Sequence, residues 1–180
     1  MSGDPARDVL VVSDATLWTG HANAALQEDG QFPYDTADFG SFGMLAKAYL
    51  DLPAHTGSAV RDYRRTLDLS NGLVSASYRL DGVTYRREVF ASHPDDVLVV
   101  RLSQSGGSSC TGSVNLLGTR GETVEAEAGA LSFTATLPNG LRYATVVRAV
   151  GSGGTVSASR TELRFTTCTE VVLIISGGTN

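Results

Sequence analysis

Apolar and polar residues alternate along much of this chain, and the alternation is clearest between residues 62 and 103. Four extended segments are predicted there, separated by turn signals: SNG at 70–72, DG at 81–82 and HPDD at 93–96. Asp-Gly supplies the positive φ angles that a two-residue type I′ hairpin requires. The pattern therefore predicts an antiparallel meander. Its last segment, VLVVRL at 97–102, is nearly continuous in apolar residues and is typical of a strand in the middle of a sandwich.

The rest of the chain continues the pattern of short β-rich runs separated by turn residues. After residue 104 we expect strands in CTGSVNLLG, TVEAEAG, ALSFTATL, LRYATVVRAV, TVSASR, LRFTT and VVLIIS. Turn signals recur about every ten residues, as in all-β sandwiches. The predicted fold is one all-β domain over residues 1–180, an antiparallel β-sandwich (super-sandwich) of roughly a dozen strands with at most one short helix.

The first third of the chain is less regular. DVLVVS at 8–13 predicts a short strand, and residues 21–41 predict a long loop with one helical turn at 22–27. FGMLAKAYLDLP at 42–53 fits either a short helix or a strand, and the bracketing Gly43 and Pro53 favour the strand. His55 falls in a polar connection, where we expect it to be solvated.

Composition and charge narrow the classes of partner. The chain has 180 residues, 42% hydrophobic and 18% charged, which is typical of a globular domain. A net charge of −5 argues against nucleic acid or an anionic membrane as a partner. No apolar run approaches the length of a membrane span, and MSGDPARD at the start lacks the regions of a signal peptide. The sequence does not indicate the cellular compartment.

Two cysteines, Cys110 and Cys168, allow one disulfide. Both lie in or beside predicted strands, so a bridge is feasible if these strands are neighbours and the compartment is oxidising. The alternative is that both are small buried hydrophobic residues.

The chain contains few residues in patterns that indicate catalytic chemistry. His21, His55 and His93 have no metal-ligand spacing, and no nucleotide-binding or nucleophile motif is present, so we expect no cofactor and no metal. A glycosidase needs two placed carboxylates, and no persuasive pair is visible. Asp81, Asp95 and Asp96 are assigned to turns, and Asp62 and Asp68 flank a strand. Glu88, Glu122, Glu125 and Glu127 are assigned to solvated strand faces.

YRRTLDL, DGVTYRREVFASHPDDVLVVRL, TLWTG and the final SGGTN together resemble the N-terminal β-sandwich domain of glycoside hydrolase family 95, which is best known for α-L-fucosidases. The resemblance covers residues 9–180. It implies that catalysis resides in a C-terminal α/α barrel of the same parent protein, that this chain alone is inactive, and that a fucosylated or related oligosaccharide is the ligand. Ser13 and Asp14 stand where the family usually has Asn-Glu.

Two functions from different classes follow. The first is a non-catalytic sandwich domain that packs on the helical barrel and helps to shape the sugar site; the second is a free-standing carbohydrate-binding module. A structural adhesion-type sandwich is a third, weaker option. The candidate residues for sugar or interdomain contact are Asp14, Trp18, His21 and Tyr34. Trp18, the only tryptophan, is either a core residue or a lid over a neighbouring surface.

Overall fold

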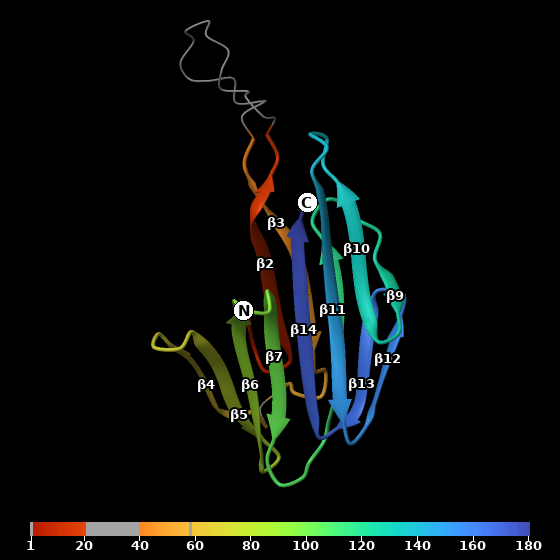
Figure 1. Cartoon of the computed structure of the whole chain (residues 1–180). Helices are drawn as coiled ribbons and strands as arrows, with labels where there is room; N and C mark the ends of the chain where they lie inside the picture. Colours follow the sequence, from red (N-terminus) through yellow and green to blue (C-terminus); the bar gives the residue numbers. More distant parts are fainter. Residues whose placement is uncertain (1, 21–39, 58) are drawn as a thin grey trace, which may run out of the picture.

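The computed structural model describes residues 2–20, 40–57 and 59–180. These residues form two antiparallel sheets that face each other, and none of them is helical (Figure 1). The predicted all-β sandwich is confirmed, and the helical turn expected at 22–27 lies outside the described residues. The strands are β1 (Ser2–Gly3), β2 (Arg7–Trp18), β3 (Phe42–Asp51), β4 (Arg61–Asp68), β5 (Leu73–Leu80), β6 (Val83–Ser92), β7 (Val97–Gln104), β8 (Cys110–Gly118), β9 (Glu125–Glu127), β10 (Ala130–Thr136), β11 (Arg142–Ser152), β12 (Thr155–Ser159), β13 (Glu162–Cys168) and β14 (Glu170–Thr179).

The larger sheet has the strand order β4-β5-β6-β7-β14-β11-β10-β9, and the smaller one β1-β2-β3-β8-β13-β12. The predicted meander is confirmed as the neighbouring strands β4 to β7. At its hairpin Asp81 and Gly82 have φ values of 50° and 80°, as a type I′ turn requires. β7 lies between β6 and β14, as its continuous apolar run predicts.

The N-terminal strands differ in part from the expectation. Residues 42–51 form a strand, as predicted, but β2 is twelve residues long rather than ending at Ser13. Its pairing with β3 slips at Ser13 and again before Trp18. These irregularities carry β2 past the regular ladder, so that Asp14 and Trp18 lie on its extension.

The core lies between the inner faces of the two sheets. Leucine, valine and alanine from every second position of the central strands fill it, and many of these side chains are fully buried. The largest contributors include Leu10, Leu17, Leu45, Leu50, Leu116, Leu131, Leu163, Phe165, Leu173 and Ile175.

The outer face of the eight-stranded sheet also carries apolar side chains near its centre, with the exposed Arg101 and Arg148 beside them. Phe90 faces Val99 and Val99 faces Ile174 across neighbouring strands. Phe90, Val146 and Val150 are 40%, 39% and 51% exposed. We call this surface the outer apolar patch; its members are Phe90, Val97, Val99, Val146, Val150, Val172 and Ile174.

In the part of the chain that the structure describes, no helix is long and apolar enough to cross a membrane. Nor do those residues bring together three His, Cys, Asp or Glu side chains that could hold a metal ion.

Candidate functional site

The extension of β2 carries Asp14 at one end of the sandwich. Leu17 is fully buried and anchors this segment to the core. The Asp14 carboxylate accepts hydrogen bonds from the backbone N–H of Thr16, at 2.7 Å, and from the Thr16 hydroxyl. The Thr16 hydroxyl is in turn hydrogen-bonded to that of Thr179 on β14. Asp14 is therefore held in a fixed position beside the end of β14.

Asp14 lines an open groove of about 680 Å³ between β2, the segment that joins β6 to β7, and β14. The groove wall contains many polar groups, among them Ser13, Asp14, Thr16, Ser92, His93, Asp96, Ser176 and Thr179. The glycine pair 177–178 forms part of its floor and exposes backbone there. Hydroxyl, carboxylate and backbone groups spread along an open groove suit a polyhydroxylated ligand.

Trp18 borders a second hollow of about 640 Å³, which is also lined by Asn139 and Asn180. Thr16 lines both hollows, so they adjoin. The Trp18 ring is half-buried and meets the ring of Phe42 edge to face, with centroids 4.7 Å apart. Phe42 is 67% exposed. Trp18 is therefore not a fully buried core residue, and its role as a lid over a neighbouring surface stays a prediction.

Asn139 fixes the backbone at Trp18 and was missed by the sequence reasoning. Its amide nitrogen donates to the carbonyl oxygens of Trp18, at 2.9 Å, and of Gly20, at 2.7 Å. Its amide oxygen accepts from the Leu141 N–H at 3.0 Å. The PNG signal at 138–140 indicated only a turn, because the two carbonyl groups that the Asn139 amide nitrogen binds are more than a hundred residues away.

The structure places two of the four candidate residues. Asp14 and Trp18 lie at the same end of the sandwich, whereas His21 and Tyr34 fall outside the described residues. His93 and Asp96, which the sequence assigned to a turn, also line the groove. A general acid is normally withdrawn from water, but Asp96 is exposed and Asp14 only half-buried. This arrangement favours binding over proton transfer.

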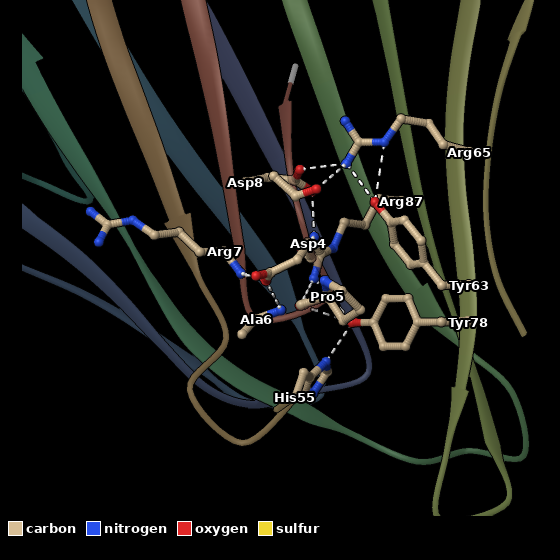
Figure 2. A network of polar contacts seen from close by, with 11 residues as sticks. Asp4, Pro5, Ala6, Arg7, Asp8, His55, Tyr63, Arg65, Tyr78 and Arg87 are labelled. Atoms are coloured by element: carbon tan, nitrogen blue, oxygen red, sulfur yellow. Dashed lines mark hydrogen bonds and ion pairs between the residues drawn. The ribbon is translucent and has the colours of Figure 1, made fainter. Parts of the chain in front are cut away.

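A second polar cluster is buried between the sheets near the N-terminus (Figure 2). Asp8 of β2 is fully buried, and its carboxylate pairs with Arg65 at 2.8 Å and with Arg87 of β6. Arg87 is 1% exposed and also donates to the carbonyl oxygens of Asp4 and Pro5. The cluster joins the start of β2 to the opposite sheet.

His55 belongs to this cluster, so the expectation that it is solvated is wrong. Its Nδ1 is hydrogen-bonded to the Tyr78 hydroxyl, and the side chain is 4% exposed. Burial, and then the nearby Arg87 charge, lower the pKa of His55 to about 4. Burial likewise raises the pKa of Tyr78 to about 12. His55 is thus neutral at pH 7.

Perturbed titratable groups can mark a catalytic site, but the burial of this cluster indicates a structural role. Asp8 and Arg87 leave no surface for a substrate to approach. One feature of the sequence indicated a buried polar cluster. Arg87 shares the inward-facing positions of β6 with Val83, Tyr85 and Val89, and a buried charge needs a partner.

Two expectations about glutamates also change. Glu125 and Glu127 are exposed as expected, but Glu122 precedes β9 and is half-buried. Burial raises the pKa of Glu122, yet hydrogen bonds from Tyr143, at 2.7 Å, and from backbone N–H groups outweigh it and hold that pKa below its usual range. Glu88 was expected on a solvated strand face, but its side chain is only 18% exposed, beside Arg86 and Arg101, and Arg87 lies on the opposite, buried face of β6.

Similarity to curated proteins is local. A probable alpha-fucosidase A from Aspergillus niger is 36% identical over 87 residues, which cover 48% of this chain and 10% of that protein. An alpha-L-fucosidase 2 from Arabidopsis thaliana is 34% identical over 62 residues, 34% of this chain and 7% of that protein. The matched regions therefore span a tenth or less of these relatives.

The fold and the family are matched over nearly the whole chain. A solved structure described as a putative kojibiose phosphorylase from human microbiome superposes on 98% of this chain and 26% of its own, with a TM-score of 0.50 and 10% identity, which supports the fold alone. Residues 4–180 match the family described as glycosyl hydrolase family 65, N-terminal domain. The chain therefore belongs to this family of glycosyl hydrolase N-terminal domains.

Proposed function

We propose that this chain is the non-catalytic N-terminal sandwich domain of an α-L-fucosidase-like glycoside hydrolase. In this proposal it packs on a helical catalytic domain of the same polypeptide, and its Asp14 and Trp18 end helps to shape the sugar site. The family match over residues 4–180 carries the proposal. The local identity to two proteins named as fucosidases supports the choice of sugar.

The outer apolar patch supports packing on another domain. The outer faces of β7 and β14 are apolar at Val97, Val99, Val172 and Ile174, before they reach the Arg101–Glu170 ion pair, and apolar residues on both faces are typical of strands that are covered on both sides. The core of the sandwich covers only the inner faces of these two strands. The fucosidases that match are about ten or more times longer than the matched regions, so relatives of this chain have further segments that could cover the outer face. We propose that the catalytic domain covers the outer apolar patch.

The groove beside Asp14 and Trp18 supports contact with sugar. The groove supplies hydroxyl and carboxylate groups, and the half-buried Trp18 borders the adjoining hollow, with the exposed Phe42 against its ring. Aromatic faces with polar neighbours are what sugar rings require. Trp18 is the only tryptophan, so its fluorescence reports on this end of the molecule alone.

The first experiment is a titration of the purified chain with fucose and with fucosylated oligosaccharides, followed by Trp18 fluorescence. We expect a saturable change that is weakened several-fold in the Asp14→Asn variant. Asp62→Asn is the control, since Asp62 is an exposed carboxylate on β4 of the other sheet. A flat response, with the chain shown to be folded, would contradict a direct role in sugar binding and leave only the packing role.

Packing on a second domain is tested separately. In the longer polypeptide that we propose, hydroxyl-radical labelling of Phe90 should fall several-fold relative to the isolated chain. Tyr63, which is 39% exposed at the edge strand β4, should label similarly in both and serves as the control. Equal labelling of Phe90 in both samples would contradict the assignment of the outer apolar patch.

A further inference from the structure

The two cysteines lie directly opposite each other on neighbouring strands of the six-stranded sheet. Cys110 begins β8, Cys168 ends β13, and the register pairs their Cα atoms. Both side chains point into the core, where they are 4% and 0% exposed, and both are free thiols in this structure. The condition that their strands are neighbours is met.

This placement matches what a disulfide requires. Directly opposed residues of an antiparallel pair have Cα atoms about 4.5–5.5 Å apart. Disulfides form across Cα separations of about 4.4–6.8 Å. The register shifts between Phe165 and Cys168, and Thr167 within this bulge has a φ of 50°. The bulge ends the ladder at Cys168 and leaves that residue at the margin of the regular pairing.

We propose that Cys110 and Cys168 form a dithiol site that closes into an intramolecular disulfide when a low-molecular-weight disulfide such as oxidised glutathione is the oxidant. One cysteine thiolate attacks a glutathione sulfur, and one glutathione thiolate leaves. The second cysteine then attacks the resulting mixed disulfide at the protein sulfur and releases the second glutathione. The protein loses two thiol protons and two electrons, and one glutathione disulfide becomes two glutathione thiols.

The surroundings indicate when the bond forms. The Cys168 thiol contacts the carbonyl oxygens of Thr155 and Thr166, at 3.6 and 3.7 Å, and packs against Gly151 of the other sheet. Burial, and then the neighbouring Cys168, raise the pKa of Cys110 to about 11. Few thiolates are therefore available in the folded chain, and the thiolate is the attacking species. We therefore expect the disulfide to form during folding, before the two sheets bury Cys110 and Cys168.

Closure would hold the two ends of the chain between residues 110 and 168 together. That stretch includes β9, β10, β11 and β12, which belong to both sheets. A disulfide that closes a loop of this length removes much conformational freedom from the unfolded chain. The oxidised chain should consequently melt at a higher temperature than the reduced chain.

The test is refolding of the reduced, denatured chain in a buffer of reduced and oxidised glutathione. Thiols are then counted under denaturing conditions, and the intact mass is measured. We expect no free thiol, a mass lower by two hydrogen atoms, one peptide that links Cys110 to Cys168, and a melting temperature roughly 10 °C above that of the reduced chain. Two free thiols, or a glutathione adduct on each cysteine, would overturn the proposal.

Variants separate the bond from effects on folding. Cys110→Ser and Cys168→Ser should each keep one thiol or one glutathione adduct and show no oxidant-dependent rise in melting temperature. Cys110→Ala with Cys168→Ala keeps small apolar side chains in the core and shows whether the fold stands without either sulfur. An oxidant-dependent rise that persists in this double variant would overturn the proposal.

Discussion

At the scale of single residues, the most consequential side chain is the Asp8 carboxylate. It is fully buried and compensated by Arg65 and Arg87. Removal of one member of a buried ion pair leaves the other charge unpaired, which typically destabilises by about 3–5 kcal/mol. We predict that Asp8→Ala lowers the free energy of unfolding by this order, measured by urea denaturation.

The matched control for Asp8→Ala is Asp51→Ala. Asp51 also pairs with an arginine, Arg7, at 3.2 Å, but the Arg7 side chain is 58% exposed. Exposed pairs contribute about 0–1 kcal/mol, so this variant should remain close to the parent. Equal losses for the two variants would contradict the role that we assign to the buried pair.

His55 predicts a pH dependence of stability. Burial lowers its pKa from the ordinary value of 6.5 to about 4 in the folded chain, so between these values the unfolded chain binds the proton more readily. The contribution of His55 to the free energy of unfolding is therefore fully present above pH 6.5. It is lost as the pH falls toward 4, by about 3 kcal/mol in total. His55→Phe, which keeps an aromatic ring but cannot titrate, should flatten this part of the urea-derived stability curve. An unchanged slope in the variant would assign the effect to another group.

At the scale of elements, the hairpin between β5 and β6 depends on positive φ angles. A side chain at Gly82 would meet no atom within 4 Å, so the cost of substitution is purely conformational. We predict that Gly82→Ala lowers the free energy of unfolding by about 1–2 kcal/mol, while Gly82→Asn, which tolerates this conformation, costs less. Thermal melting of both variants checks this, and a larger loss for Asn would contradict it.

The elements themselves were largely predictable, since alternation and turn residues are local properties. The meander, its type I′ turn and the strand at 42–51 follow from them. The extension of β2 did not, because its pairing depends on two slips against β3. His55 and Asn139 were misjudged or missed for a related reason. Their partners, Tyr78 and the Trp18 carbonyl, come from distant segments, and no local pattern reports such contacts.

At the scale of the whole molecule, we predict that this chain alone does not hydrolyse fucosylated substrates. The groove beside Asp14 is open and offers carboxylates that remain accessible to water. The check is an assay with an aryl α-L-fucoside and with a natural fucosylated oligosaccharide. Hydrolysis that disappears in an Asp14→Asn or Asp96→Asn variant would show that the groove is catalytic and would contradict the proposed division of roles.

The order of strands across the sheets could not be predicted from the sequence. Alternation indicates which residues face inward, but not which strands are neighbours when they are separated along the chain. β14 pairs with β7 and β11, and β3 pairs with β8, across long stretches of sequence. The candidate site depends on these pairings, because β2, β14 and the 138–140 turn meet only in the folded sandwich (Figure 1).

The central position of β14 has a consequence for the order in which the protein is made. This strand is the last of the fold along the chain, yet it joins the β4–β7 meander to the β11-β10-β9 half of the sheet. During synthesis on the ribosome both halves exist before the strand that unites them, and each exposes an unpaired edge. The large sheet can therefore be completed only after residues 170–179 have left the ribosome, because this strand joins its two halves.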